Sequence, residues 1–443
     1  VDVFRFNFKH NKTSWHSHMI EKVNNVANKL SKPIGTLIDL QGPEIRLFIL
    51  KNLEQIELKK NQLLEIGVDI QFSHPQIKEI LKNNQKILVD DGYFIFIVKK
   101  NNNKIYLQSQ TQGLLKNRKT VNLPEVNLDF PSLVERDFEG LKLAAIKEID
   151  YIALSFVRSD KDIIDLKNEM KKYNVKSKII AKIETKKAID NIDSIIKEVD
   201  GVMVARGDMA VEISWESVPY YQKMIIKKAR EAGKFVITAT QMLESMINNP
   251  LPTRAEVSDV ANAFYDGTDA VMLSAESASG RYPIEAVLMM KKILEFNESR
   301  FSWQDNYGLL NLSNDETDLI TRAAFEIYQK IKNQQRLAGF IVFTETGKTA
   351  ITLSRFHPKI PIFAISPNKK IADFLNVYFG IYPVVYPLLR SGLVDINEIN
   401  KVIKFLVSNF KTSKLKENQS FVVLHGDYWG KTGGTSTVRI VNI

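Results

Sequence analysis

Short apolar runs alternate with amphipathic stretches of helical period between about residues 137 and 296. Such runs have the length of buried strands, and the stretches between them have the length of helices. This alternation is typical of a parallel sheet covered by helices. The predicted strands, two of which lie further upstream, are VDVFRFNF, IGTLIDLQG, YIALSFV, SKIIAKIE, GVMVARGD, KFVITATQ and DAVMLSAES. Seven strands are one short of a closed (β/α)8 barrel.

Two other regions have different patterns. From Arg46 to about residue 129, strand-like runs separated by turn residues predict a small inserted β domain. An example is KILVDDGYFIFIVKKNNNKIYLQSQ, with an Asp91-Gly92 turn. Beyond about residue 300, the strands FIVFT, PIFAIS, YPVVYP, FVVLHG and VRIVNI predict a second α/β unit. The predicted division is residues 1–46 and 129–297 for the βα-barrel, 47–128 for the inserted domain and 298–443 for the C-terminal α/β domain.

Polar residues gather at the carboxyl ends of the predicted barrel strands, where barrel enzymes place their chemistry. They are Arg5, Asn7, Asp39, Lys182, Glu184, Asp208, Thr240 and Ser274. Helix capping explains any one of them but is a poor explanation for the whole set. For Thr240 and Ser274 alone, a cap and a substrate contact fit equally well, and Gln241 and Glu244 are expected to open a helix.

Lys182, Glu184 and Asp208 form the most informative group. Glu184 and Asp208 end adjacent predicted strands, so their carboxylates face a shared cavity that suits a hard divalent cation, magnesium best of all. Lys182 points to the same side of its strand as Glu184 and has the charge to stabilise a phosphoryl group in transfer. A buried salt bridge among the three is the alternative interpretation.

Composition narrows the possible functions. The chain has 443 residues and no cysteine, which excludes disulfides, thiolate nucleophiles and cysteine-zinc sites. The net charge of +10 comes from lysines scattered along the chain, which favours a solvated surface and phosphate-bearing ligands over nucleic acid. No apolar run is long enough for a membrane span and the N-terminus has no signal-peptide pattern, so we expect a cytoplasmic protein without membrane contact.

One long segment, ITATQMLESMINNPLPTRAEVSDVANAFYDGTDAVMLSAES, resembles the signature of pyruvate kinases. KIET, DGVMVARGDMA, DLQGPEIR, RFNFKH, LVDDG and TVNLPEV resemble other blocks of this family in the same order, over nearly the whole chain. The resemblance implies transfer of a phosphoryl group from phosphoenolpyruvate to ADP, giving pyruvate and ATP in glycolysis. It also implies a barrel domain, an inserted β domain that closes over the site, a C-terminal effector domain and a homotetramer.

The resemblance also implies residue roles. Lys182 matches the family's transition-state-stabilising lysine, and Glu184 and Asp208 match its Mg2+ (or Mn2+) ligands. Other matched positions are Arg5 on the transferring phosphoryl group, Gly207, Asp208 and Thr240 at the substrate, and Arg46 and Lys119 at the nucleotide. Ser274 is expected at the substrate from its place at a strand end. Of these, Lys182, Thr240 and Arg5 are the expected catalytic residues.

The expected potassium site departs from the family pattern. Asn7 and Asp39 are kept, but Lys9 stands in place of a serine and Leu40 in place of a threonine. One hypothesis is that the Lys9 ammonium occupies the potassium position and replaces K+, and the alternative is a site damaged by drift. Family members also carry a strand and helix ahead of VDVFRFNF, so either the sequence is a fragment or the barrel is open, with exposed strand edges.

The C-terminal domain contains TETGKTA ahead of a predicted helix, whose hydroxyls and amides suit a phosphate. The resemblance implies a sugar-phosphate or nucleotide effector site here, at Thr344, Thr346, Gly347 and Thr349, completed by the loop GDYWGKTGGTST. A plain Thr/Gly-rich turn is the alternative.

Two other functions remain open. A magnesium-dependent lyase acting on pyruvate or oxaloacetate would share the carboxylates but would need no ADP. A regulatory paralogue without turnover would bind polynucleotide in a salt-sensitive way.

Overall fold

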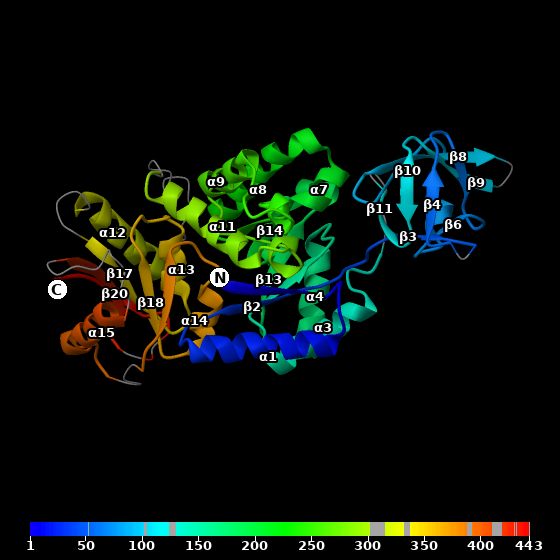
Figure 1. Cartoon of the computed structure of the whole chain (residues 1–443). Helices are drawn as coiled ribbons and strands as arrows, with labels where there is room; N and C mark the ends of the chain where they lie inside the picture. Colours follow the sequence, from blue (N-terminus) through cyan, green and yellow to red (C-terminus); the bar gives the residue numbers. More distant parts are fainter. Residues whose placement is uncertain are drawn as a thin grey trace.

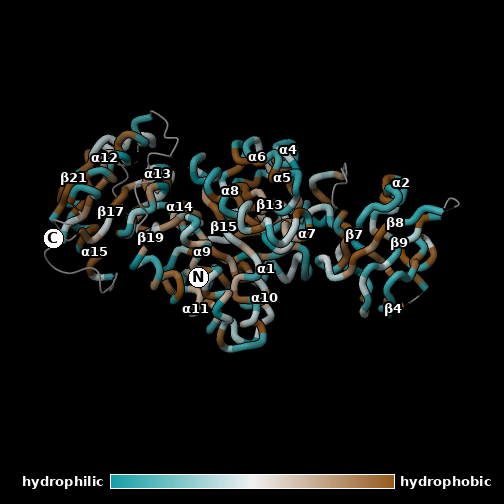
Figure 2. The backbone as a smooth tube through the Cα atoms, turned by 90° about the horizontal axis from the view of Figure 1, so that it is seen from above, coloured by the Kyte–Doolittle hydropathy of each residue, from teal (hydrophilic) through white to brown (hydrophobic). Residues whose placement is uncertain are grey.

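The computed structural model describes residues 1–51, 53–101, 104–123, 130–301, 315–331, 337–387, 392–409, 419–428, 430 and 432–442. Three units lie in a row, with the parallel sheet and its helices between an antiparallel β unit and a smaller α/β unit (Figure 1). Hydrophobic stretches of the chain, brown in Figure 2, occur in all three units. In the described part of the chain, no helix combines the length and apolar character that crossing a membrane requires.

The central unit contains all seven predicted barrel strands in one parallel sheet. They are β1 (Val3–Asn7), β2 (Gly35–Asp39), β12 (Tyr151–Leu154), β13 (Lys178–Ile183), β14 (Gly201–Ala205), β15 (Phe235–Ala239) and β16 (Ala270–Val271). Their order in the sheet is their order along the chain. Among the described residues, β1 and β16 are the two edges, so the fold is a (β/α) barrel sheet that is not closed. The expectation of seven strands, one short of eight, is confirmed.

Helices follow these strands and cover the sheet. They are α1 (Thr13–Lys29), α3 (Glu135–Lys147), α4 (Asp160–Lys172), α5 (Lys186–Asp190), α6 (Ile192–Glu198), α7 (Arg206–Glu212), α8 (Val218–Glu231), α9 (Arg254–Asp266), α10 (Ala275–Ala278) and α11 (Pro283–Glu298), with 3-10 turns η1 (Trp215–Ser217) and η2 (Glu244–Ile247). The prediction that a helix opens at Gln241 is wrong. Gln241 has φ of 53°, outside the helical region, and only the short η2 forms after it.

The inserted unit is antiparallel and has its own core. Its strands are β3 (Arg46–Ile49), β4 (Gln55–Leu58), β5 (Leu63–Glu65), β6 (Ile70–Phe72), β7 (Lys86–Val89), β8 (Phe94–Asn101), β9 (Lys104–Ser109), β10 (Gly113–Lys116) and β11 (Lys119–Asn122), with the short helix α2 (Ile77–Ile80). Seven of them form one sheet, and β10 pairs with β4. Arg46, expected to end the first barrel segment, is the first residue of β3. The expected boundary at residues 128 and 129 lies outside the described residues.

The third unit contains the five predicted C-terminal strands. They are β17 (Leu337–Phe343), β18 (Ile362–Ser366), β19 (Ile381–Val385), β20 (Ser420–Gly426) and β21 (Thr435–Asn442), with helices α12 (Glu316–Ile331), α13 (Lys348–Ser354), α14 (Lys369–Leu375) and α15 (Ile396–Asn409). Four strands are parallel, and β21 pairs antiparallel with β20 at one edge. One hydrophobic cluster includes both barrel residues, such as Tyr151 and Phe235, and residues of this unit, such as Phe340.

Candidate active site

The Lys182 ammonium lies between two carboxylates at the carboxyl edge of the barrel sheet. Lys182, near the end of β13, has its Nζ 3.4 Å from Asp39 Oδ1 and 3.4 Å from Glu184 Oε2. The same ammonium donates to Ser155 Oγ at 2.7 Å. The carboxylates are 1% exposed and the lysine side chain is 12% exposed, so little water screens the three charges.

The surroundings keep the Lys182 side chain charged. Burial alone would lower the pKa of Lys182, but Asp39 and Glu184 raise it above its ordinary value. Burial would raise the pKa of Asp39, yet the charges of Lys182 and Arg5 bring it below the usual range. Burial raises the pKa of Glu184 to about 7, against the effect of Lys182 and with a further contribution from Asp208.

Glu184 and Asp208 have the properties of ligands for a divalent cation. Glu184 Oε1 accepts the Phe156 N–H at 2.6 Å, whereas the buried Oε2 has no hydrogen-bond partner in the described part of the chain. Asp208 lies in the first turn of α7, directly after the neighbouring strand β14. No cluster of three or more metal-ligating side chains occurs among the described residues. Two carboxylates with open positions fit a magnesium-type ion that takes its other ligands from substrate and water.

Thr240 lies beside the N-terminus of α7. Its Oγ1 accepts the Gly207 N–H at 2.8 Å and donates to the Ala239 carbonyl at 2.6 Å. The residue has φ of 68°, a strained conformation for threonine, and Arg206 binds its carbonyl oxygen at 2.6 Å. Thr240 therefore caps helix α7, and not a helix that follows it in the sequence. Ser274 precedes α10 and makes no side-chain cap bond there.

Arg5 and Lys9 have different partners at the end of β1. Arg5 Nε donates to Asp39 Oδ2 at 2.7 Å, which draws this side chain to the Lys182 group. The Lys9 ammonium pairs with Glu44, whose other oxygen lies 2.7 Å from Arg46. The described contact between Lys9 and Asn7 does not involve the ammonium, because the Lys9 backbone N–H donates to Asn7 Oδ1 at 3.1 Å. The ammonium expected at the Asn7 and Asp39 position is thus placed against Glu44, and Asp39 pairs instead with Arg5 and Lys182. Leu40 is buried in the barrel core.

Arg46 and Lys119 lie on two paired strands of the inserted unit. They begin β3 and β11, which pair antiparallel with Thr120 opposite Arg46. Arg46 donates to the Arg118 carbonyl at 2.7 Å, and Lys119 donates to Asp90 at 2.8 Å. Both cations are more exposed than Lys182, at 34% of each side chain against 12%.

Two residues of the site were missed by the sequence analysis. Ser155 accepts from Lys182 and donates to Asp39 at 3.2 Å, and Glu44 joins Lys9 to Arg46. Ser155 directly follows β12, so the strand-end rule that found the others would also have found it. Glu44 lies in the loop before β3, where no strand-end pattern applies.

The predicted effector segment forms a turn in the third unit. Gly347, with φ of 83°, precedes α13 and donates its N–H to Thr344 Oγ1 at 2.8 Å. Thr349 and Thr435 join their hydroxyls at 2.7 Å. A small cavity of about 50 Å³ is lined by Thr344, Thr346, Lys348, Thr349 and glycines of the facing loop. Residues 429 and 431 of that loop lie outside the described part of the chain.

The fold and site define a class of protein, a barrel enzyme with an inserted β unit whose strand ends hold a charged lysine between carboxylates. The family model "Pyruvate kinase, barrel domain" matches residues 1–287, and "Pyruvate kinase, alpha/beta domain" matches residues 319–441. The chain therefore belongs to the pyruvate kinase family, and it is an enzyme of the kinase class. Kinases of this family need a divalent metal.

Individual relatives agree with the family match. The chain is 38% identical to the pyruvate kinase of Clostridium perfringens, with 100% of this chain and 94% of that protein aligned. It is 34% identical to that of Thermotoga maritima, over the same shares of the two chains. It is 39% identical to that of Clostridium acetobutylicum, over 87% of this chain and 83% of that protein.

Proposed function

We propose that the chain transfers the phosphoryl group of phosphoenolpyruvate to ADP, forming pyruvate and ATP as the last step of glycolysis, in the cytoplasm. The observation that carries this proposal is the Lys182 ammonium, held 3.4 Å from two buried carboxylates and kept charged by them. Phosphoryl transfer depends mainly on positioning and on stabilising the negative charge that develops on the phosphoryl oxygens. A fixed cation with little water around it is suited to that task.

The barrel half of the site would bind the phosphoryl donor. Glu184 and Asp208 would hold Mg2+ or Mn2+, which supplies positive charge to the phosphoryl and carboxylate oxygens when bound. Lys182 and Arg5 would contact the phosphoryl group during transfer. The Gly207 amide and the Thr240 hydroxyl, already in contact at 2.8 Å, would orient the carboxylate of the substrate, with Ser274 at the edge of the site.

The inserted half would bind the nucleotide. Arg46 and Lys119 lie on the paired strands β3 and β11, one position apart in the register, with partly exposed cationic heads that suit the ADP phosphates. The Glu44 carboxylate, shared by Lys9 and Arg46, joins this half to the end of β1. Nucleotide contacts on a separate unit allow closure over the substrates.

Lys9 is proposed to make the enzyme independent of potassium. Its ammonium brings a fixed positive charge to the loop after β1, where it is bound to Glu44, while its backbone N–H binds Asn7 Oδ1. Equal rates in potassium and in tetramethylammonium buffers are expected, and Lys9→Ser should create activation by potassium. Lys12→Ser, an exposed change in the same segment, is the control. Strong potassium activation of the unaltered chain would refute this assignment.

The turn at Thr344, Thr346, Gly347 and Thr349 is proposed to bind the phosphate of a sugar-phosphate or nucleotide effector. Its hydroxyls and the Lys348 side chain line a small cavity together with the facing loop.

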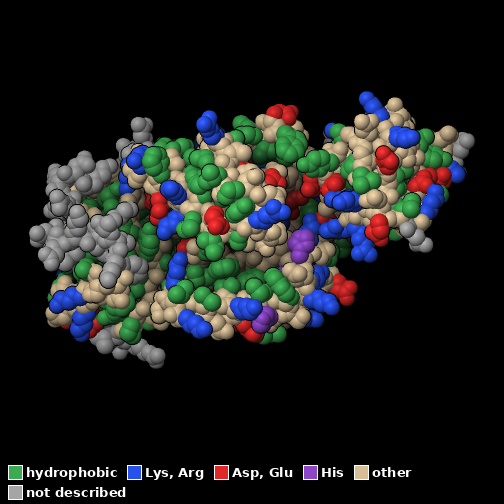
Figure 3. All heavy atoms as spheres, viewed as in Figure 1, with side chains coloured by type: hydrophobic (Ala, Val, Ile, Leu, Met, Phe, Trp, Pro, Cys, Tyr) green, Lys and Arg blue, Asp and Glu red, His purple; other side chains and the backbone are tan. Residues whose placement is uncertain are grey.

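A homotetramer is also proposed. Ile284, Leu288 and Phe296 of α11 are each more than half exposed. Figure 3 shows hydrophobic side chains among charged ones on one face of the molecule. An apolar helix face of this kind is typical of a subunit interface, and light scattering after chromatography would measure the assembly.

The decisive assay follows pyruvate release from phosphoenolpyruvate with and without ADP, in the presence of Mg2+. ADP-dependent turnover, reduced in Asp208→Asn with a higher Mg2+ requirement, is the expected result. The exposed Asp190→Asn serves as the control. Turnover without ADP would favour a lyase, and folded protein without turnover that binds polynucleotide would favour a regulatory paralogue.

A further inference from the structure

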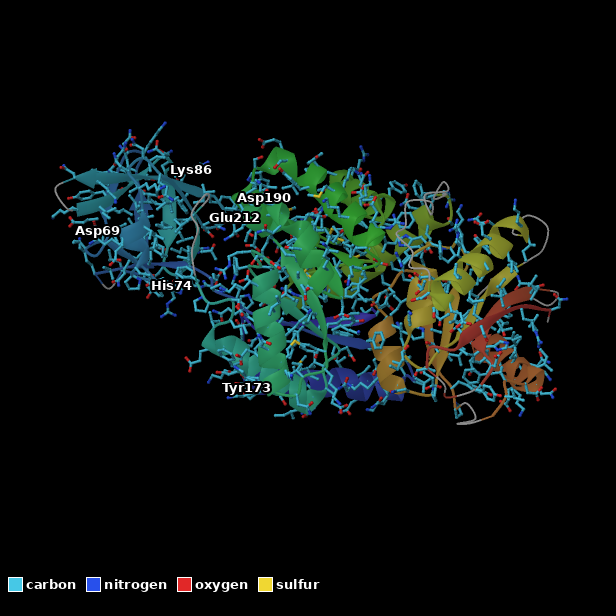
Figure 4. All side chains as sticks on the ribbon, turned by 180° about the vertical axis from the view of Figure 1, so that it is seen from behind. Asp69, His74, Lys86, Tyr173, Asp190 and Glu212 are labelled. Carbon is cyan, nitrogen blue, oxygen red and sulfur yellow. The ribbon has the colours of Figure 1, made fainter. Side chains whose placement is uncertain are left out.

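A large cavity lies between the inserted unit and the barrel. Its volume is about 960 Å³, at the upper end of the range for small-molecule sites, which is roughly 300–1,000 Å³. Figure 4 shows that Lys86 comes from the inserted unit and that Asp190 and Glu212 come from the barrel beside it. Neither Lys182 nor Asp208 is among the lining residues, so the cavity is distinct from the proposed phosphoryl-transfer site.

Much of the lining is apolar. It includes Leu88 of β7 and Val121 of β11 on one wall, and Val211 and Phe156 on the other. Trp215 of η1 also lines the cavity and is 66% exposed. An indole left this open to water, next to apolar walls, gains free energy when a flat ring stacks on it.

The charged lining favours an anion. Four basic side chains line the cavity, Lys86, Arg158, Lys186 and Lys187, against the three acids Asp190, Glu212 and Glu216. Lys186 is already paired with Asp190. Lys86 is exposed and forms no hydrogen bond or ion pair within the described part of the chain.

Glu212 is already engaged by the inserted unit. Its Oε1 accepts a hydrogen bond from Asn122 of the inserted unit at 2.9 Å. Burial raises the pKa of this carboxyl despite that bond, and Asp208 adds to the rise. The Lys86 ammonium and the Trp215 ring are thus the two lining groups best able to gain new contacts from a ligand.

We propose that this cavity is a second ligand site, which takes a small amphipathic anion with a flat ring system and one carboxylate, phosphate or sulfonate group. The ring stacks on Trp215 and the anionic group pairs with Lys86. The site lies beyond the proposed kinase function, and binding to it does not depend on that function.

An occupant would affect catalysis through the shared walls. Phe156 lines the cavity and also donates its N–H to Glu184, and Glu212 lies on the same helix as Asp208. The occupant also spans the inserted unit and the barrel. It would therefore hold the two units at their present separation and oppose closure.

The first test titrates the whole chain with 8-anilinonaphthalene-1-sulfonate, a fluorescent ring anion, and follows its emission. One saturable site is expected, and Trp215→Ala and Lys86→Gln should each weaken it by about tenfold or more, as for loss of a charge-assisted bond or a ring contact. Trp15→Ala and Lys82→Gln, exposed residues outside the cavity, are the matched controls and should bind as the parent does. Equal affinity in all five proteins would overturn the proposal.

Two further measurements separate this site from the active site. Because closure couples the two sites reciprocally, ADP and phosphoenolpyruvate should raise the Kd of the dye only to a plateau, whereas a Kd that rises in proportion to substrate, as for competition at one site, would overturn the proposal. In the turnover assay, the dye should lower kcat of the parent and not of Trp215→Ala. Unchanged kcat with dye bound would refute the coupling to catalysis. Failure of the kinase assay itself would leave the dye-binding result standing, so the two proposals fail independently.

Discussion

The barrel meets its two neighbouring units in opposite ways. Towards the C-terminal unit, a single hydrophobic cluster crosses the interface, and Asp373 accepts the Ile34 N–H at 3.1 Å. Towards the inserted unit, the described contacts include one hydrogen bond, from Asn122 to Glu212 at 2.9 Å, beside the large cavity. The inserted unit has a hydrophobic cluster of its own.

This difference matters because the proposed site is divided between the barrel and the inserted unit. The donor half is built from the ends of packed barrel strands, where neighbouring side chains hold each charge in place. The nucleotide half lies on the unit with the weaker attachment. Units with separate cores and small interfaces move relative to each other, whereas a barrel and a domain that share one core are expected to unfold together. The donor half is therefore expected to stay rigid, and movement of the nucleotide half is expected to let substrates enter and leave.

The largest expected effect is on the donor half. Lys182→Met should lower kcat by about 10³-fold, because a preorganised charge at the transferring group is lost. Lys178→Met, on the same strand but paired at the surface with Asp200, is the control. Steady-state kinetics and a thermal melt of each variant distinguish lost chemistry from lost folding. A loss of less than tenfold in folded Lys182→Met would contradict the role given to this lysine.

The two cores should respond separately to large-to-small changes. Phe340→Ala, in the cluster shared by barrel and C-terminal unit, should cost about 3–5 kcal/mol and lower their joint transition. Phe96→Ala should cost a similar amount but lower only the transition of the inserted unit. Differential scanning calorimetry measures both, with Tyr93→Ala, 80% exposed, as the control. A Phe96→Ala variant that lowers every transition equally would show that the units are coupled after all.

Acid should weaken the barrel interface with the C-terminal unit. Burial, and then Arg230, lower the pKa of His357 to about 4, although Asp269 lies 3.8 Å away. The unfolded chain, with a pKa near 6.5, therefore binds the proton more readily, so this histidine's contribution is present above pH 6.5 and is lost as pH falls towards 4. The loss is on the order of 3 kcal/mol.

Comparing variants isolates this effect. Asp150, whose pKa burial raises to about 6, acts in the opposite sense over part of the same window, but it is present in every protein compared. His357→Asn, which tolerates the local φ of 45°, should lose less Tm between pH 7 and pH 4.5 than the parent. His18→Asn, at an exposed position, should behave like the parent. Equal acid sensitivity in all three proteins would exclude His357.

The smallest effect is expected at the nucleotide half. Lys119→Ala should raise KM for ADP by about tenfold, the scale of one charge-assisted contact, and leave KM for phosphoenolpyruvate unchanged. Lys104→Ala, another lysine of the inserted unit paired with Glu65, is the matched control. An equal rise in both KM values would mean that the two halves do not divide the substrates as proposed.

The sequence by itself determined the strands and much of the site. Period-two and period-3.6 patterns are local, and the carboxyl ends of neighbouring parallel strands meet at one edge, so Lys182, Glu184 and Asp208 could be grouped without coordinates. The tertiary structure decided which counter-charge each cation takes. Lys182 lies by Asp39, which is 143 residues upstream in the numbering, and Lys9 lies by Glu44. It also decided the conformation after Thr240 and the cavity beside Trp215. These features depend on how separate strands and units pack, and side-chain partners chosen by packing leave no local periodicity in the chain.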